Sequence, residues 1–452
     1  MPQKRTKPSA SKGEGSTRPI VSAVLADGTL VETLFNPKSG TTDFAVWKND
    51  FVEVRKDFVQ AGVRYVPFSP HNSLLKHGAV LLPSEVSPYE SDDDLLSEIR
   101  TFIHHYVDVG ELFEQIASYY ALLTWVYDSF NELPYLRLKG DAGSGKTRFL
   151  LTVGSLCYKP IFASGASTVS PLFRMIDSIR GTLVIDEGDF RFSDEHSEIV
   201  KILNNGNARG FPVLRSEVSP NGEYSPRAYS IFGPKLIATR RSFDDRALES
   251  RCITEEMGGH SLREDVPITL PSEHKVEALS IRNKLLSFRF RNFGRYPAAD
   301  GLLGREIEPR LRQVFTPLLS VVEGRAIREN LTSLVRSYQD QYVTDRAMSV
   351  EAQVLEVICD LVGLKEGRLS IKEVATWFSD RFGDEYEKRI TAKWIGGVVR
   401  NQLQIRTQKS HGVFVIPPGE YSKLEWLFKK YGLRTEDETD LTIGTETGTS
   451  GT

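Results

Sequence analysis

The stretch best suited to chemistry begins at Gly140 and reads G-x-x-x-x-G-K-T. This pattern is typical of a loop that binds the phosphates of a nucleotide. Gly140, Gly143 and Gly145 allow the backbone to turn tightly and to aim its N–H groups at phosphate oxygens. Lys146 supplies a mobile positive charge for the β- and γ-phosphates, and the Thr147 hydroxyl is a ligand for Mg²⁺. The predicted nucleotide contacts are Gly140, Asp141, Ala142, Gly143, Ser144, Gly145, Lys146, Thr147 and Arg148.

The residues around this loop predict the elements that position it. Tyr135–Lys139 has the apolar character of a short strand, and apolar residues recur at helical spacing from Phe149 to Leu156. A helix that opens at the loop directs its positive end toward the phosphates. An ordinary Gly/Ser turn before Lys-Thr is the alternative, and the strand before and the helix after it favour nucleotide binding.

A pair of acidic residues follows further along the chain. Gly181–Glu187 reads as an apolar strand that ends in Asp-Glu. In combination with the phosphate loop, this arrangement predicts that Asp186 holds the Mg²⁺ water shell opposite Thr147 and that Glu187 polarises the attacking water. An apolar strand that ends in two acids would be weak evidence without that loop.

The segment after the acidic strand predicts a β-hairpin. Phe211–Arg215 and Ala228–Phe232 are the pairing segments, and Ser219–Gly222 is the turn. Arg209 and Arg215 lie on the leading side. Two interpretations stay open: a hairpin that projects into a central pore and grips a polymer, or a surface hairpin with solvated arginines.

Another strand, Lys235–Thr239, ends in a polar residue and leads into the arginine-rich segment Arg240–Cys252. An arginine at the rim of one subunit can reach the γ-phosphate of its neighbour and stabilise transition-state charge. Arg251 is the preferred candidate for this role and Arg246 the second. Surface salt bridges with the acidic residues of the same segment are the alternative for at least one of them.

The order of these motifs, from the phosphate loop to Leu248-Glu-Ser-Arg251, resembles the AAA+ superfamily of P-loop ATPases. Within that superfamily it is similar to the helicase branch: superfamily 3 and minichromosome-maintenance-type helicases and the ATPase halves of phage and mobile-element primase–helicases. The resemblance covers roughly Tyr135 to Gly324. It implies ATP and Mg²⁺ as cofactors, and a homo-oligomeric ring, for example a hexamer, that acts on DNA with other replication proteins.

The same resemblance suggests further roles. It implies Thr239 at the sensor-1 position, Arg251 as an arginine finger that acts in trans, and Arg310 as sensor 2, with Arg312 as the second choice. Two features depart from the family pattern. Many relatives carry Asn at sensor 1, where this chain has Thr239 followed by Arg240, and the predicted hairpin tip has no Lys or Arg.

Composition sets wider limits. The chain has 452 residues, 40% hydrophobic and 26% charged, which indicates a soluble globular protein of about three domains. A net charge of −3 restricts any nucleic-acid site to a local patch. The three cysteines have neither disulfide nor zinc spacing, and no apolar run is long enough for a membrane, so we expect a cytoplasmic protein.

The predicted fold class is α/β: a P-loop AAA+ core with a helical lid, preceded by a small β-rich domain and followed by a winged helix-turn-helix domain. The lid contains Arg289, Arg291 and Arg295 interleaved with phenylalanines. These residues could stack on bases. Alternatively, they could form the solvent-exposed and buried faces of one lid element, which is the interpretation that we favour. The predicted divisions are a disordered basic arm 1–19, a β-rich domain 20–90, a helical linker 91–134, the core 135–257, the lid 258–345, the winged helix 346–432 and a disordered acidic tail 433–452.

The C-terminal part has the pattern of three helices followed by a β-hairpin. This is the winged-helix plan, in which one helix enters the major groove and the hairpin contacts phosphates. A protein-docking winged helix is the alternative, and the cations favour DNA. The predicted DNA contacts are Lys393, Arg400, Arg406, Lys409 and His411.

Together these features predict an ATP-driven oligomeric DNA motor, a helicase-like ATPase that serves the replication of a mobile or phage-like element. Two alternatives remain. The first is a DNA-bound ATP switch, an initiator or loader that does not unwind. The second is a protein-remodelling ATPase whose winged helix docks a partner.

Overall fold

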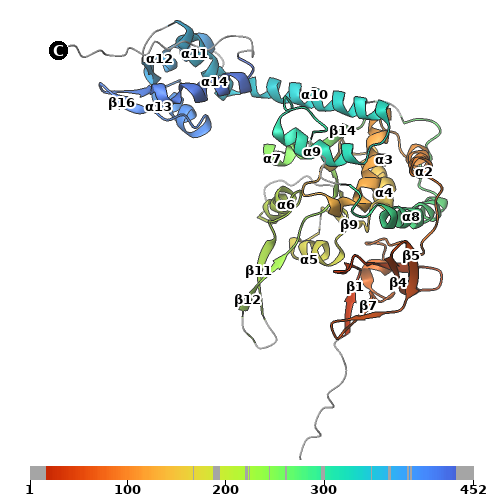
Figure 1. Cartoon of the computed structure of the whole chain (residues 1–452). Coiled ribbons are helices and arrows are strands. Elements are labelled where there is room, and N and C mark those ends of the chain that lie inside the picture. Colours follow the sequence, from red (N-terminus) through yellow and green to blue (C-terminus); the bar gives the residue numbers. More distant parts are fainter. Residues whose placement is uncertain are drawn as a thin grey trace, which may run out of the picture. The chain divides into compact units, whose positions relative to one another are not determined.

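A computed structural model describes residues 17–433, apart from 166, 187–193, 219–221, 223, 244, 260–261, 297–300, 348, 365–367, 384–385 and 387–388; at 194–197, 342–347 and 363–364 it describes the backbone only. The chain divides between Ser333 and Leu334 into two compact units (Figure 1). Each unit is described by itself.

A parallel five-stranded sheet organises the first unit. Its strands are β8 (Tyr135–Lys139), β9 (Ile161–Ser164), β10 (Leu183–Asp186), β13 (Lys235–Thr239) and β14 (Cys252–Glu256). The spatial order is β14-β8-β13-β10-β9, and every pair is parallel. The carboxyl ends of parallel strands meet at one edge of a sheet, so the residues after β8, β10 and β13 lie together. The predicted α/β class is confirmed, and the sheet is consistent with a P-loop NTPase core.

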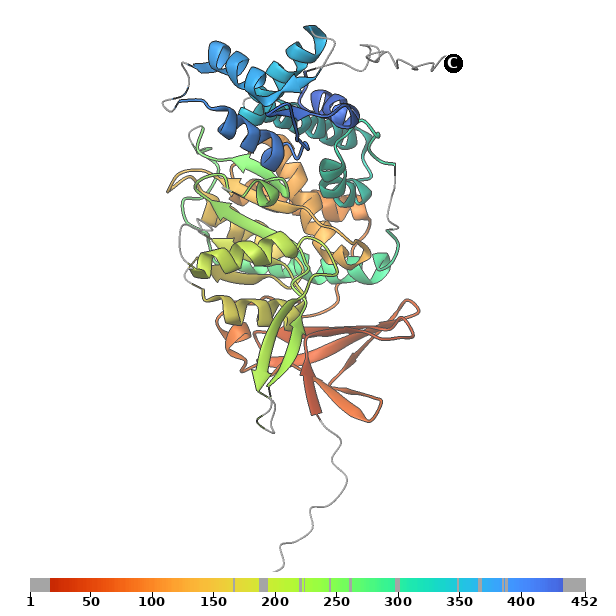
Figure 2. The ribbon, with the colours of Figure 1, turned by 90° about the vertical axis from the view of Figure 1, so that its left-hand side faces the viewer.

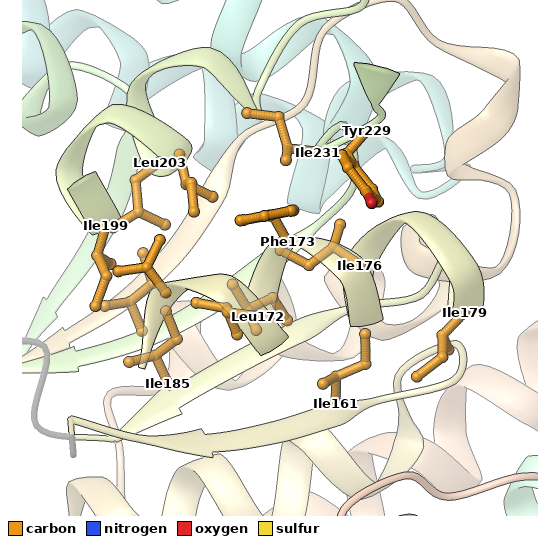
Figure 3. Packing of buried hydrophobic residues seen from close by; sticks show 14 of the residues in the cluster. Ile161, Leu172, Phe173, Ile176, Ile179, Ile185, Ile199, Leu203, Tyr229 and Ile231 are labelled. Atoms are coloured by element: carbon orange, nitrogen blue, oxygen red, sulfur yellow. The ribbon is translucent and has the colours of Figure 1, made fainter. Parts of the chain in front are cut away.

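Helices cover both faces of this sheet, because successive side chains of a strand point to opposite faces. Ile161 and Ile185 pack into an apolar cluster with α5 (Val169–Ile179) and α6 (Asp194–Asn205) (Figure 3). The intervening side chains Phe162 and Val184 face the other way. There they approach Gly154 of α4 (Lys146–Leu156) so closely that a Cβ at this glycine would lie 3.1 and 3.2 Å from them.

Three further helices lie beside α4: α2 (Asp92–Tyr106), α3 (Glu111–Trp125) and α8 (Glu273–Asn292). The Arg282 side chain of α8 donates to the carbonyl of Ser155 in α4 over 2.8 Å. Helix α8, which falls in the predicted lid, therefore packs directly on the nucleotide-loop helix. The remaining helices of this region are α1 (Ser73–Lys76), the 3-10 turn η1 (Tyr127–Ser129), α7 (Arg246–Glu249), α9 (Pro309–Ser320) and α10 (Arg325–Ala347).

The N-terminal strands form two small sheets, of order β2-β3-β4-β5 and β1-β7-β6. Glu32 of the first sheet is buried and connects this sheet to the core, since it accepts hydrogen bonds from Tyr158 and Arg289. The segment after these strands extends the core sheet, since Val80 forms a β-bridge with Ile161. The strands are β1 (Thr17–Ile20), β2 (Ser22–Val24), β3 (Leu30–Asn36), β4 (Thr41–Lys48), β5 (Phe51–Arg55), β6 (Phe58–Gln60) and β7 (Val63–Pro67).

The predicted hairpin is present as β11 (Val213–Val218) and β12 (Tyr224–Tyr229), which pair antiparallel. It extends away from the core (Figure 2). Some of its exposed side chains are large and apolar, with Leu214 64% and Tyr224 79% exposed.

The second unit has its own apolar core. Its order of elements is helix, strand, two helices and a hairpin, with a sheet of order β15-β17-β16. The capping box predicted at Ser370 and Glu373 is present at the start of α12. The elements are α11 (Val350–Leu364), β15 (Leu369–Ser370), α12 (Ile371–Phe382), α13 (Ala392–Gly397), the π-helical turn η3 (Val398–Gln402), β16 (Gln408–Ser410), β17 (Val413–Ile416), the 3-10 turn η4 (Pro418–Glu420) and α14 (Tyr421–Lys430).

None of the helices in the described part of the chain combines the length and the apolar character that a membrane crossing needs.

Candidate functional site

The phosphate-type loop lies between β8 and α4, as predicted. Gly143 and Gly145 adopt φ of 83° and 92°, which glycine reaches without strain. Gly145 is the N-cap of α4. A Cβ at Gly140 would lie 2.5 Å from the carbonyl oxygen of Met257. These three glycines are therefore required by the path of the backbone.

The Lys146 ammonium lies inside this loop. It donates to the carbonyl of Gly140 at 2.6 Å, to the carbonyl of Asp141 at 2.5 Å and to the Ser144 hydroxyl at 3.3 Å. Three residues that precede the lysine in the chain thus hold its charge at the loop. A phosphate that entered the loop would offer this ammonium stronger, charged acceptors than the carbonyls it now contacts.

Thr147 and Asp186 meet across two elements. The Thr147 hydroxyl at the start of α4 donates to Asp186 Oδ2 at the end of β10, over 2.7 Å. Within the described ranges, no group of three or more His, Cys, Asp or Glu side chains could hold a metal ion. Mg²⁺ needs no such group, since it commonly uses one or two protein oxygens together with waters and substrate phosphates. The hydroxyl–carboxylate pair fits that ion.

Thr239 ends β13, the strand between β8 and β10. Its side chain is only 1% exposed, and among the residues that the structure describes its hydroxyl finds no hydrogen-bond partner. An unpaired buried hydroxyl costs about 1–3 kcal/mol. Such a group between the loop and Asp186 is well placed to bind a ligand oxygen or a water.

A cavity of about 320 Å³ joins these residues. Its volume lies in the range typical of ligand pockets. Its lining consists of Ala142, Gly143, Ser144, Gly145, Lys146, Thr147, Asp186, Thr239 and Arg240.

A second cavity, of about 490 Å³, shares the loop residues Ala142 to Gly145 with the first and is also lined by Asp141. The sequence did not predict its remaining walls. Apolar side chains from two distant segments dominate them, with three carboxylates among them. These walls are Val107, Asp108, Val109, Arg148, Glu255, Glu256, Met257, Gly258, Leu262 and Ile268.

Arg148 contributes to this second cavity. Its guanidinium donates to the carbonyls of Pro267 and Ile268. The side chain therefore fixes one wall of the larger cavity, and it does not line the smaller one that contains Lys146.

Arg251 lies at the other end of the sheet. Its carbonyl accepts from the amide of Tyr135, the first residue of β8, so it sits at the amino end of the strand whose carboxyl end carries the loop. Its guanidinium donates to Asn207 Oδ1 at 2.8 Å and to Asn204 Oδ1 at 3.1 Å. Asn204, near the end of α6, and Asn207, two residues beyond that helix, thus position it.

Arg310 is close enough to Arg251 to repel it. Burial lowers the pKa of Arg251, and the positive charge of Arg310 lowers it further. Arg310 lines neither of the two cavities at the loop, whereas Arg246 is exposed and the buried Nε of Arg312 finds no acceptor among the described residues.

Glu187, the predicted water-polarising residue, lies outside the described residues. So do most residues of the hairpin turn.

The two hairpin arginines contact the body of the unit. Arg209 donates to the carbonyls of Phe130 and Asp128, at 3.0 and 2.8 Å. Arg215 pairs with Glu198 at 3.1 Å and lies over the Phe173 ring. Both side chains are engaged at the base of the hairpin and do not extend with it. A hairpin that grips a polymer in a central pore stays a prediction.

Of the arginines in α8, Arg291 is exposed beside the buried Phe288 and Phe290, as the favoured interpretation expects, whereas Arg289 differs from both interpretations. Arg289 is buried and donates to Glu32 at 2.8 Å, to Asp128 at 2.7 Å and to the carbonyl of Trp125 at 2.6 Å. It is therefore neither a base-stacking group nor part of a solvent-exposed face. Carboxylates from β3 and η1 compensate its buried charge. Arg291 lies over the ring of Tyr89.

The five predicted DNA contacts lie in α13, η3 and the hairpin of the second unit. Lys393 and Lys409 are exposed. His411 forms the turn with φ of 48°. The Arg406 amide donates to Glu420 over 3.2 Å. The Arg400 side chain turns back, since its guanidinium donates to Thr407 and lies 5.5 Å from the centre of the Phe414 ring.

Comparison with known proteins adds few constraints. No family model matches the chain, and no curated protein matches it. Among solved structures, the C-terminal region of NrS-1 shares 11% identity at a TM-score of 0.36, over 85% of this chain and 95% of its own. JCV helicase shares 13% at 0.24, over 55% and 66%. A Thermotoga maritima RuvB mutant shares 14% at 0.25, over 70% and 96%. Scores this low assign no function to the chain.

Proposed function

We propose that this chain is a Mg²⁺-dependent ATPase that drives an oligomeric DNA motor, a helicase-like protein in the replication of a mobile or phage-like element. The observation that carries the ATPase proposal is the convergence of Lys146, Thr147, Asp186 and Thr239 on one cavity from three strand ends. We infer that a base and sugar occupy the second, larger cavity, which shares residues of the same loop.

Each residue of the first cavity has a distinct task. Lys146 leaves the loop carbonyls for the β- and γ-phosphates, and Thr147 and Asp186 provide the oxygen ligands for Mg²⁺, which neutralises developing phosphate charge when it is bound. Thr239 offers its unpaired hydroxyl to a γ-phosphate oxygen or to the attacking water. Glu187, next to Asp186 in the chain, polarises that water.

A second copy of the chain completes the reaction in this proposal. Arg251 lies at the amino end of the sheet and Lys146 at the carboxyl end, so Arg251 serves the nucleotide of another copy. Head-to-tail contacts of this kind close into rings when the rotation between copies permits. Arg310, beside Arg251, adds charge to the same anion site.

DNA binding belongs to the second unit in this proposal. The order α11-β15-α12-α13-β16-β17 is that of a winged helix, with α13 as the helix that faces DNA. Lys393, Lys409 and His411 are available for phosphate contacts, whereas Arg400 braces the hairpin against η3.

The test measures steady-state ATP hydrolysis by wild type and by Lys146→Ala, with no DNA, with single strands and with forked duplex. We expect DNA-stimulated hydrolysis in wild type and a loss of at least about 100-fold in the variant, since the lysine contacts the transferred phosphate. Equal, slow turnover by both proteins on every DNA would contradict the ATPase proposal.

Strand displacement on the same forked duplex separates the motor from its alternatives. Hydrolysis with displacement supports the motor. Hydrolysis that single strands stimulate, without displacement, would indicate a DNA-bound switch. Hydrolysis that no DNA changes, in a protein with no DNA affinity, would indicate a protein remodeller.

A further inference from the structure

The second unit contains a hollow that the predicted groove contacts do not explain. It runs along α13 and η3, with a volume of about 410 Å³. Its lining consists of Thr391, Lys393, Trp394, Gly397, Val398, Asn401 and Gln402.

Trp394 is the central feature of this hollow. Its side chain remains 38% exposed, although its ring packs edge-to-face against two aromatic neighbours. The ring centres lie 5.8 Å from Phe378 and 5.5 Å from Tyr386. The Trp394 amide also donates to Thr391, the cap of α13. These contacts hold the ring in place, so it presents a fixed aromatic surface to solvent.

The polar groups of the hollow divide into two kinds. Asn401 and Gln402 are exposed amides at the end of η3, and Lys393 is an exposed ammonium at the start of α13. Amides can both donate to and accept from the edge of a base, whereas an ammonium suits a phosphate. Among the residues that the structure describes, no carboxylate lines the hollow.

The neighbouring arginine is directed elsewhere. The Arg400 guanidinium folds over Gly396, where a Cβ would lie 3.0 Å from it, and donates to Thr407. The π-helical turn that follows α13 shifts Asn401 and Gln402 onto the side of Trp394. The exposed surface of the helix pair is therefore aromatic and amide-rich, which suits a stacked base better than the edges of a closed groove.

We propose that this hollow binds one unpaired nucleobase, stacked on Trp394, with Asn401 and Gln402 on its edge and Lys393 on the adjacent phosphate. A base within a duplex cannot enter, since its faces and its pairing edge are already occupied. The inference rests on the proposed DNA function and deepens it. It names an unpaired nucleotide at the border of single and double strand as the DNA feature that the second unit recognises.

The test measures binding of the full-length chain to labelled DNA by fluorescence anisotropy at fixed salt. The probes are a blunt duplex, the same duplex with a single-stranded extension, and that extension with abasic sites in place of the bases. We expect wild type to prefer the extension with bases over the abasic one by about tenfold, the scale of base–aromatic stacking. Trp394→Ala should remove this preference and leave the affinity for blunt duplex unchanged.

Two variants keep the test independent of folding. Trp377, on α12, is 41% exposed and does not line the hollow, so Trp377→Ala should retain the full preference. Asn401→Ala with Gln402→Ala removes only exposed amides and should lower the preference about threefold, as for lost hydrogen bonds at an exposed site. Its effect decides the question if Trp394→Ala fails to fold.

The results that would contradict the base site can be told apart from those that would contradict the proposed function. Equal affinity of wild type for the normal and the abasic extension would overturn the base site while leaving the ATPase and duplex-binding proposals intact. An equal loss in Trp377→Ala would overturn it as well, since the effect would not come from the hollow. A wild type that hydrolyses ATP but binds none of these probes would overturn both the base site and the DNA role, and would leave the hollow to a protein partner.

Discussion

The two ends of the central sheet differ in a way that separates their tasks. At the carboxyl end, Lys146, Thr147, Asp186 and Thr239 converge on a cavity. At the amino end, Arg251 is held by two asparagines beside Arg310. Strand β8 has five residues and therefore spans roughly 16 Å. An arginine at one end cannot reach a phosphate at the other, so the sheet separates nucleotide binding from the charge that would complete hydrolysis.

The largest expected effect concerns Arg251. We expect Arg251→Ala to reduce the maximal hydrolysis rate by about 10³-fold, the usual contribution of an arginine finger, without weakening ATP binding by more than about twofold. Rate and nucleotide affinity are measured separately. A variant that lost nucleotide affinity as well would contradict the separation of the two ends.

Arg310→Ala is the companion change at the same end. The Arg310 charge lowers the pKa of Arg251, so its removal relieves repulsion and at the same time weakens an anion site. We expect the hydrolysis rate to fall about tenfold, less than for Arg251→Ala, since Arg310 acts indirectly, by adding charge beside Arg251. If nucleotide affinity fell and the hydrolysis rate at saturating ATP stayed unchanged, Arg310 would instead be assigned to nucleotide binding at the carboxyl end of the sheet.

At the carboxyl end, Thr239→Val separates activity from stability. The substitution keeps the shape and removes a buried hydroxyl without a partner among the described residues. We expect the free energy of unfolding to rise by about 1 kcal/mol and the hydrolysis rate to fall at least about tenfold. Thr239→Ser retains the hydroxyl and should restore the rate. A Val variant with normal rate would assign Thr239 to packing alone.

The change with the smallest expected effect on hydrolysis is at a buried lysine outside the cavity. Lys146 lies at the cavity, whereas Lys235, the first residue of β13, is buried with its ammonium on the carbonyls of Gly206, Ile231 and Gly233. Burial lowers the pKa of Lys235 to about 7.

Because this pKa is depressed on folding, the unfolded state binds more protons than the folded state above about pH 7. Stability should therefore rise from pH 7 toward pH 10, and Lys235→Met should flatten that slope in denaturant titrations. An equal slope in both proteins would show that the carbonyls hold the charged form despite burial.

The sequence predicted the carboxyl end better than the amino end, for a physical reason. The loop residues are neighbours in the chain, and Asp186 and Thr239 end apolar strands, so spacing and topology alone place them together. The walls of the larger cavity, such as Val107 and Leu262, are ordinary apolar residues that only tertiary packing brings to the loop.

Arginines were the least predictable side chains, because their long stems allow contacts with distant elements. Helical periodicity gave no sign that Arg289 would be buried against Glu32, which lies in a strand far away in the sequence. Arg400 is exposed, but its guanidinium folds back over Gly396 and donates to Thr407, a contact that the helical pattern did not indicate. Trp394 carried no chemical signal in the sequence, where it reads as a core aromatic.

The most direct test of the central claim mixes two inactive variants, Lys146→Ala and Arg251→Ala, and measures ATP hydrolysis. The first lacks a working carboxyl end and the second a working amino end. When the two mix at random in a head-to-tail assembly, about one interface in four combines both intact ends. The account predicts that the mixture regains hydrolysis that neither variant shows alone. A mixture as inactive as its components, in assemblies shown to exchange subunits, would contradict it.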